Sequence, residues 1–273
     1  MSITFKPDDF LLQMDDRTNE VMNIVHKYDA FLDALTTPEF SQLRESTREA
    51  IRYFVSNKYP NTEEIAKHTF SQSKKLQAHY GDLSDYLNHI QIKDKKSFSI
   101  DLATGTGKSW VIYAVAQIML SEGLCDKVLV LCPSITIEEE LKSKFERFSG
   151  NQELTKILQE LDALYPSPAI KSANDPILNG DICVENIHAV YDRTGSSIKD
   201  SFNGKGQRTL VISDEAHHIY SQPDVGGRTW KRWYEFLVDE DYDFQYLLGV
   251  TGTPYIGDEY FHDCIYRYSL KQG

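Results

Sequence analysis

Short apolar runs rich in β-branched residues alternate with amphipathic stretches from about residue 96 onwards. Because these runs contain few polar residues, they are typical of strands that are buried on both faces of a parallel sheet. The predicted strands are FSIDL from Phe98, KVLVLCP from Lys127, DICVENI from Asp181, TLVISDE from Thr209 and YLLGVTGTP from Tyr246.

Two helical segments are predicted between the first three of these strands. Apolar residues recur at helical spacing from Ser109 to Glu122, and Gly123 marks the end of that helix. A longer polar segment with helical character extends from Ile137 to about Leu164. This alternation of strand and helix predicts an α/β fold, in which a parallel sheet is flanked by helices. In such folds, ligands bind at the carboxyl ends of the strands.

Residues 1–95 are predicted to form a mainly helical N-terminal region. Apolar side chains such as Phe31, Leu32 and Leu35 recur there at the spacing of one helix face. We therefore expect two units, the helical region and an α/β lobe over residues 96–273.

The composition is that of an ordinary globular protein, since 41% of the 273 residues are hydrophobic and 26% are charged. No apolar run approaches the roughly 18 residues that span a bilayer, and the N-terminus lacks a signal-peptide pattern. We therefore expect a cytoplasmic protein with no membrane partner. The four cysteines form no C-x-x-C pair and are predicted to be free thiols. The net charge of −12 argues against tight, non-specific duplex binding, but not against a motor that grips a strand in a narrow groove.

The segment ATGTGKS follows the first predicted strand and precedes a predicted helix, which is the arrangement of a phosphate-binding loop. Its backbone N–H groups and the helix N-terminus would attract a β-phosphate. Lys108 would add a charge beside the β and γ oxygens, and the Ser109 hydroxyl would be a ligand of Mg²⁺. Leu102 stands where the general pattern has glycine, and the alternative interpretation is a glycine-rich turn with a chance lysine. The predicted ATP-binding residues are Thr104, Gly105, Thr106, Gly107, Lys108 and Ser109.

The run DEAH ends the fourth predicted strand. Asp214 is predicted to hold Mg²⁺ together with Ser109, while Glu215 orients and deprotonates the attacking water. His217 joins Lys108, Asp214 and Glu215 as a candidate catalytic residue, with a plain surface position as the alternative. By itself the run also fits a solvated acidic loop after a core strand.

The run TGTP ends the fifth predicted strand. The hydroxyls of Thr251 and Thr253 are predicted to bond back to the acidic run and to relay the state of the nucleotide. A simple turn is the alternative, because glycine and proline are the commonest turn residues. However, the three motifs occur in one order, each at the end of a predicted strand. Together they predict a P-loop fold that binds ATP and Mg²⁺.

In this order, ATGTGKS, DEAH and TGTP resemble motifs I, II and III of superfamily 2 helicases. The resemblance implies that the α/β unit is the first RecA-like lobe of an ATP-hydrolysing helicase or translocase. LVLCPSITIEEELKSKF from Leu129 resembles motif Ia, and VENIHAVY from Val184 resembles the next strand-contact region. The nucleic-acid contacts implied by this resemblance are Pro133, Ser134, Thr136, Asn186 and His188.

DEAHH, GVTGTPY and YRYSL resemble more narrowly the helicase module of type I and type III restriction enzymes and related phage-defence helicases. This resemblance implies action on DNA rather than RNA, in restriction-modification or antiviral defence, with a nuclease or methyltransferase subunit as a partner. The segment from Leu43 resembles the entry segment of the family, in which a glutamine usually reads adenine. Thr47 stands at that place here, and Gln42 is the alternative reader.

Superfamily 2 motors also carry a second RecA-like lobe, whose arginines complete the ATP site. Only about 19 residues follow TGTP, fewer than a further domain needs, so we expect a fragment whose second lobe lies elsewhere in cis. By itself the chain is expected to be weakly active or inactive. Two other functions stay open: a motor lobe that acts in DNA repair or on RNA, and a nucleotide-binding regulatory module without motor activity.

Overall fold

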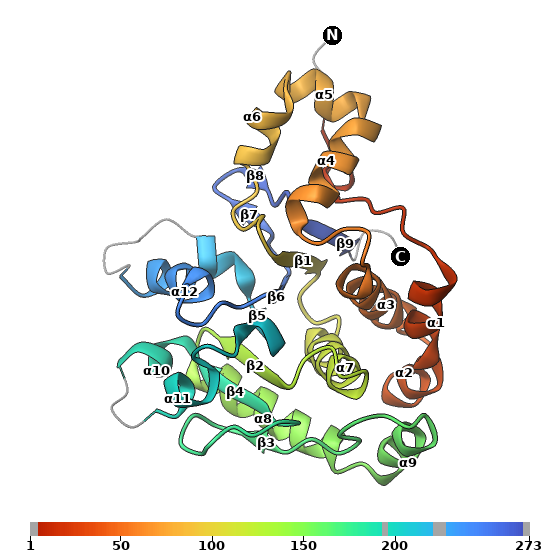
Figure 1. Ribbon diagram of the computed structural model, residues 1–273, viewed down its shortest axis with the longest axis vertical. Helices are drawn as coiled ribbons and strands as arrows, with labels where there is room; N and C mark the ends of the chain where they lie inside the picture. Colours follow the sequence, from red (N-terminus) through yellow and green to blue (C-terminus); the bar gives the residue numbers. More distant parts are fainter. Residues whose placement is uncertain (1–4, 193–195, 221–227, 270–273) are drawn as a thin grey trace.

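A seven-stranded parallel sheet forms the centre of the protein, with helices on both faces (Figure 1). The computed structural model describes residues 5–192, 196–220 and 228–269. The α/β fold of a P-loop lobe is confirmed, and each predicted strand is present. The strands of the sheet are β1 (Lys96–Leu102), β2 (Lys127–Cys132), β3 (Ile170–Lys171), β4 (Ile182–Asn186), β5 (Thr209–Asp214), β6 (Tyr246–Thr251) and β9 (Cys264–Tyr268). A separate antiparallel hairpin joins β7 (Tyr255–Ile256) to β8 (Glu259–Tyr260).

The strand order is β3-β4-β2-β5-β6-β1-β9. Strand β6 therefore lies between β1 and β5, with Asp101 opposite Thr251 and Asp214 opposite Val250. Because all these strands run in the same direction, the segments that follow β1, β5 and β6 leave the sheet side by side, at the carboxyl ends of its strands. Those segments carry ATGTGKS, DEAH and TGTP.

The residues of each central strand point alternately into two apolar layers. In β2, Val128 and Val130 belong to one layer, while Leu129 and Leu131 belong to the other. Helices α1, α2, α3, α7 and α8 contribute to the first layer, and α10, α11 and α12 contribute to the second.

The helices are α1 (Asn19–Lys27), α2 (Asp29–Leu35), α3 (Ser41–Val55), α4 (Thr62–Gln72), α5 (Lys74–Tyr80), α6 (Leu83–Asn88), α7 (Lys108–Ser121), α8 (Ile135–Ser149), α9 (Gln152–Glu160), α10 (Ile187–Asp192), α11 (Ile198–Phe202) and α12 (Arg228–Val238), with 3₁₀ turns η1 (Pro7–Phe10), η2 (Gly206–Arg208) and η3 (Ala216–Tyr220).

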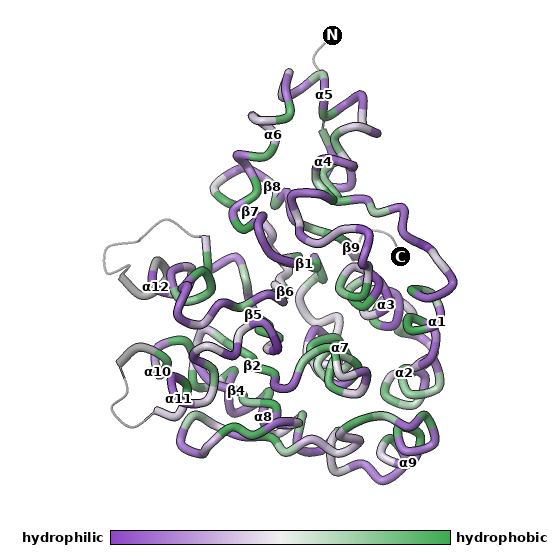
Figure 2. Tube along the Cα trace, in the orientation of Figure 1, coloured by the Kyte–Doolittle hydropathy of each residue, from purple (hydrophilic) through white to green (hydrophobic). Residues whose placement is uncertain are grey.

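Helix α7, which follows the glycine loop, is largely hydrophobic along its length (Figure 2). Its residues from Val111 to Ser121 are buried, because the sheet covers one side and α3 covers another. On α3, the Tyr53 ring lies 5.3 Å and the Phe54 ring 5.4 Å from the Phe98 ring of β1. The N-terminal helices thus share one apolar core with the sheet, and their division into a separate domain stays a prediction.

Two local features differ from the sequence expectations. The helical segment expected from Ile137 to about Leu164 is interrupted, because α8 ends at Ser149 and α9 begins at Gln152, with Asn151 as its N-cap. The Asn151 side chain accepts hydrogen bonds from the backbone N–H groups of Glu153 (2.9 Å) and Leu154 (3.3 Å). Strand β9, which extends the sheet beyond β1, was not predicted, and neither were the two-residue strands β3, β7 and β8.

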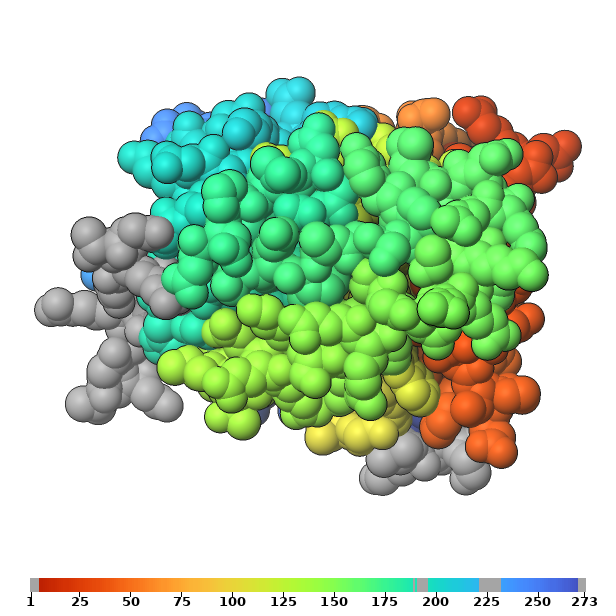
Figure 3. Space-filling view, turned by 90° about the horizontal axis from the view of Figure 1, so that it is seen from below, coloured from red at the N-terminus to blue at the C-terminus, as the bar shows by residue number. Residues whose placement is uncertain are grey.

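Strand β3 forms the other edge of the sheet and contains only two residues, which limits the unpaired backbone that this edge exposes. Seen from below, side chains of α8, α9 and the segment through β3 form a continuous surface across this end (Figure 3). The four cysteines are buried and free, as expected. Within the described residues, no helix has the length and hydrophobicity needed to cross a membrane.

Candidate nucleotide-binding site

The loop between β1 and α7 has the backbone conformation that its glycines allow. Gly105 and Gly107 have φ angles of 81° and 94°, in the left-handed region where other residues are strained. Thr106 closes the loop, because its hydroxyl donates to the Ala103 carbonyl at 2.6 Å and its N–H donates to the same oxygen at 3.2 Å. Helix α7 begins at Lys108, so its positive N-terminal end lies at the mouth of the loop.

The two carboxylates at the end of β5 have different surroundings. Asp214 is buried, and burial raises its pKa to about 6 even though the nearby Lys108 lowers it. Glu215 has a φ of 52°, an uncommon value for a residue other than glycine, and its side chain forms an ion pair with Lys108. The backbone N–H of Glu215 donates to Asp214 Oδ1 at 3.0 Å. One carboxylate is therefore held inside the site, and the other lies beside the lysine of the glycine loop.

His217 connects this acidic run to the end of β6. Its Nδ1 lies 2.9 Å from the hydroxyl of Thr251 and 3.5 Å from Glu215 Oε2. Burial lowers the pKa of His217, and His218 lowers it further, so the neutral ring is favoured. The backbone N–H of Thr253 donates to the same Thr251 hydroxyl at 3.1 Å. Glu215, His217 and both threonines thus form one chain of contacts, and their role in coupling stays a prediction.

Gly252 brings the TGTP loop against the glycine loop. A Cβ atom at this position would lie 3.0 Å from the Leu102 carbonyl oxygen and 3.2 Å from the Thr104 backbone nitrogen. Both neighbours are backbone atoms, so a larger residue would push the two loops apart. The three predicted motifs therefore form one cluster at the carboxyl ends of β1, β5 and β6.

A pocket of about 360 Å³ opens at this cluster. Its volume lies within the roughly 300–1,000 Å³ that is typical of small-molecule sites. One side of the pocket comes from α8, a contribution that sequence analysis did not predict. The sequence does contain a signal for this contribution, because the α8 residues that line the pocket recur every three to four positions and therefore lie on one face of the helix. The lining residues are Thr104, Gly105, Gly107, Lys108, Ser109, Asp214 and Glu215, together with Ile137, Glu140, Leu141 and Lys144 of α8.

These side chains fit a magnesium–nucleotide ligand. Ser109 and Asp214 supply a hydroxyl and a carboxylate to the same pocket, and such oxygens are the ligands that Mg²⁺ prefers. The raised pKa of Asp214 indicates a buried carboxyl whose charge Lys108 only partly compensates. A divalent cation beside it would favour the ionised form. Lys108 and the N-terminus of α7 provide the positive surroundings that phosphate oxygens require.

The residues predicted to contact nucleic acid lie at the ends of β2 and β4, which are neighbours in the sheet. Ser134 caps α8 by accepting a hydrogen bond from the Ile137 N–H at 3.3 Å, and Pro133 beside it is partly exposed. Thr136 and His188 are exposed. Contact between these four residues and a nucleic acid strand stays a prediction.

Asn186 has a different environment from the one expected of a surface contact. Its side chain is buried, and its amide nitrogen donates to Glu138 Oε2 at 2.6 Å and to Glu185 Oε1 at 3.1 Å. Asn186 therefore joins α8 to β4. Glu138, the residue that holds it there, was not singled out from the sequence.

The entry segment lies beside the glycine loop. A Cβ atom at Gly107 would be 3.1 Å from the Leu43 side chain, so the start of α3 contacts the loop. Thr47 is buried and donates its hydroxyl to the Leu43 carbonyl at 2.8 Å, within α3 itself. Gln42 is also buried, and adenine recognition by it stays a prediction.

Among solved structures, the chain is similar to the Sulfolobus solfataricus SWI2/SNF2 ATPase core in complex with dsDNA, with 15% identity, a TM-score of 0.38, and coverage of 58% of this chain and 28% of that chain. It is also similar to the UvsW helicase from bacteriophage T4, with 13% identity, a TM-score of 0.38, and coverage of 72% and 63%. For the yeast DEAD-box splicing factor Prp28 the identity is 16%, the TM-score 0.39, and the coverage 76% and 44%. The chain thus spans less than two thirds of the length of each of these structures. A comparison with curated protein sequences finds no match.

A family description does match most of the chain. The ResIII family, described as "Type III restriction enzyme, res subunit", matches residues 42–256. The matched range begins at the start of α3 and includes the glycine loop, the acidic run and the TGTP loop. This protein therefore belongs to the ResIII family.

Proposed function

We propose that this chain is the ATP-binding lobe of a motor that hydrolyses ATP when it is bound to nucleic acid. The observation that carries the proposal is the pocket shared by Lys108, Ser109, Asp214 and Glu215, with α7 beginning at its mouth. Its chemistry suits a triphosphate, because a cation and a helix N-terminus face a hydroxyl and two carboxylates.

Each residue has a defined part in the proposed reaction. Lys108 and the loop N–H groups bind the β- and γ-phosphates, while Ser109 and Asp214 hold Mg²⁺. An ion held by these two residues would neutralise charge that develops on the phosphate oxygens. Glu215 accepts a proton from the attacking water. As the γ-phosphate draws Lys108 away from Glu215, the contacts through His217 to Thr251 transmit that change to the TGTP loop.

The proposed substrate strand is DNA, and the proposed setting is restriction or phage defence. Membership of the ResIII family supports this choice, since the family description is that of a restriction-enzyme subunit. The proposal includes a second RecA-like lobe in cis, together with a nuclease or methyltransferase subunit as a partner. ATPase assays of the two-lobed protein with single-stranded DNA and RNA separate this function from that of an RNA motor.

We expect Lys108→Ala to weaken MgATP binding by about 10- to 100-fold, the equivalent of one or two charge-assisted hydrogen bonds. Isothermal titration calorimetry on the 273-residue chain measures this loss. The fold is expected to survive, because the contacts between Thr106 and Ala103 hold the loop. Lys144→Ala is the matched control: Lys144 lines the same pocket but pairs with Glu140 on the surface of α8, and its loss is expected to have little effect. Unchanged ATP affinity in Lys108→Ala would overturn the proposal.

Thr251→Val is expected to leave ATP affinity largely unchanged and to lower DNA-stimulated turnover by about tenfold, the kinetic equivalent of one hydrogen bond. Valine keeps the shape of the side chain but removes the hydroxyl that contacts His217 and the Thr253 N–H. Thr251→Ser keeps the hydroxyl and is expected to retain turnover. The assay compares phosphate release by the two-lobed protein with and without DNA, and equal stimulation in both variants would exclude a coupling role.

A further inference from the structure

A second cluster of ligand-type side chains lies away from the pocket, between the N-terminal helices and the hairpin that follows TGTP. His89 directly follows α6, Glu259 begins β8, and His262 lies between β8 and β9. The hairpin and α6 are neighbours near the top of the molecule (Figure 1). The proposed ATPase reaction uses none of these three residues.

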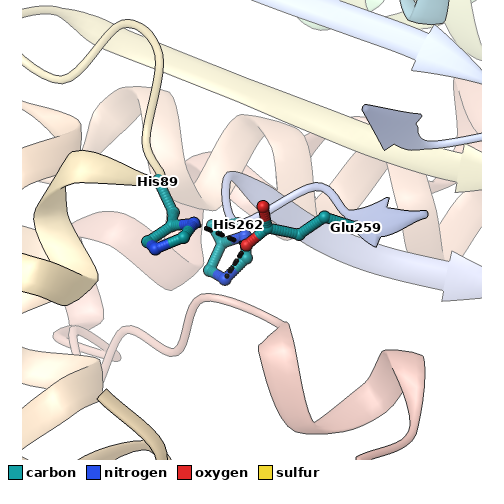
Figure 4. A group of neighbouring side chains, drawn as sticks. All are labelled: His89, Glu259 and His262. Carbon is teal, nitrogen blue, oxygen red and sulfur yellow. Dashed lines mark ion pairs between the residues drawn. The ribbon is translucent and has the colours of Figure 1, made fainter. Parts of the chain in front are cut away.

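The three side chains converge on one carboxylate oxygen (Figure 4). Glu259 Oε1 lies 2.5 Å from His89 Nδ1 and 3.5 Å from His262 Nε2. The three ligand atoms all lie within 4.8 Å of one another. Atoms bound to one tetrahedral ion at 2.0–2.1 Å are about 3.3 Å apart. Small side-chain movements are therefore enough to place all three at bonding distance from a single ion.

The His262 ring is prepared to act as a ligand. It is almost fully buried, and its Nε2 faces Glu259 Oε1 and the Tyr80 hydroxyl.

The cluster also has an entrance from solvent and a hydroxyl group beside it. The side chains of His89 and Glu259 are 36% and 44% exposed, so an ion can reach the buried His262 from solvent. The Tyr80 hydroxyl contacts the same Nε2 of His262, so an ion bound at Nε2 takes the place of this contact.

We propose that His89, Glu259 and His262 bind a divalent transition-metal ion, with Zn²⁺ as the ion that fits best. Two imidazoles and one carboxylate suit Zn²⁺, which prefers four-coordinate sites with nitrogen and oxygen ligands, whereas Mg²⁺ prefers six oxygens. The bound ion joins the end of α6 to the segment after TGTP. It therefore fixes the N-terminal helices against the part of the lobe that would respond to ATP.

Zinc titration of the metal-free, untagged chain without nucleotide tests this site. After removal of metals with a chelator, we expect uptake of one Zn²⁺ per chain at this cluster, measured by competition with a chromophoric zinc indicator. At a Zn²⁺ concentration of about 100 times Kd, Tm is expected to rise by about 5 °C or more, since the ion binds only the folded state. Equal concentrations of Mg²⁺ are expected to give no such rise.

His89→Gln and Glu259→Gln change partly exposed positions, so neither variant threatens the core. Each is expected to lower Zn²⁺ affinity by at least about 100-fold, because even changes outside the ligand set cost roughly 10- to 100-fold. His26→Gln is the matched control, an exposed histidine that pairs with one carboxylate, Asp29, and it is expected to retain full affinity. Two results would contradict the proposal: no saturable Zn²⁺ uptake by the unaltered chain, or Zn²⁺ uptake by both cluster variants equal to that of the unaltered chain. Either result would show that Glu259 is only a hydrogen-bond acceptor between two histidines.

Discussion

Replacing Glu215 with glutamine is expected to reduce ATP turnover by about 10²- to 10⁴-fold, the usual contribution of a general base. Glutamine keeps the size of the side chain but cannot accept a proton from water. Glu215 has a φ of 52°, and its side chain forms an ion pair with Lys108 inside the pocket. Such conformations cost energy and are concentrated at functional sites.

ATP binding is expected to persist in Glu215→Gln, because the charge opposite Lys108 is removed and the lysine stays available to phosphate. Phosphate release measures turnover in the two-lobed protein, and calorimetry measures affinity. Glu140→Gln is the control, since Glu140 lines the same pocket from α8 but pairs with Lys144. Turnover near the normal rate in Glu215→Gln would remove Glu215 from the mechanism and favour a different base.

The fold was predictable where burial alone determines the pattern. Strands β2, β4 and β5 are buried throughout, so each contains an unbroken run of at least three apolar residues that the pattern of hydrophobic positions identifies. Strand β9 was missed, because it lies at the sheet edge and its last three residues, from Tyr266, are only partly buried. The break between α8 and α9 depends on the cap at Asn151, a local contact within an otherwise continuous helical pattern.

The residues of the candidate site were predictable where they come directly after a predicted strand. The glycine loop, Asp214 and Glu215 each lie within a few residues of a strand, so local sequence identifies them. That β6 lies between β1 and β5 is a property of strand order, which no single segment encodes. The contact between His217 and Thr251 depends on that order.

The environment of a residue was harder to predict where its contacts come from distant parts of the sequence. Asn186 follows a strand in the manner of a surface contact, yet Glu138, 48 positions earlier, accepts its amide hydrogen and holds it inside. His89 and His262 have no common motif, and only packing of α6 against the β8–β9 region brings them together. Spacing in the sequence carries no signal for such pairs.

The 273-residue chain by itself is expected to hydrolyse ATP about 10³- to 10⁵-fold more slowly than the two-lobed protein, the usual contribution of an arginine finger. Among the described residues that line the pocket, the cations are Lys108 and Lys144, and each is already paired with a carboxylate. No arginine lines this part of the described structure, so charge on the departing γ-phosphate lacks a dedicated partner. We therefore expect the pocket to bind ATP with these groups, and in the proposed reaction a further cation from the second lobe stabilises the transition state.

Single-turnover phosphate release from the chain at saturating MgATP measures this difference, with the two-lobed protein assayed beside it. Addition of DNA is expected to leave the rate of the isolated chain unchanged, because a bound strand supplies no positive charge to the pocket. In the two-lobed protein, replacing the arginine that completes the site should lower turnover to about the rate of the isolated chain. If the isolated chain instead showed rapid, DNA-stimulated turnover, the groups already in this pocket would suffice for catalysis and the second lobe would have only a mechanical role.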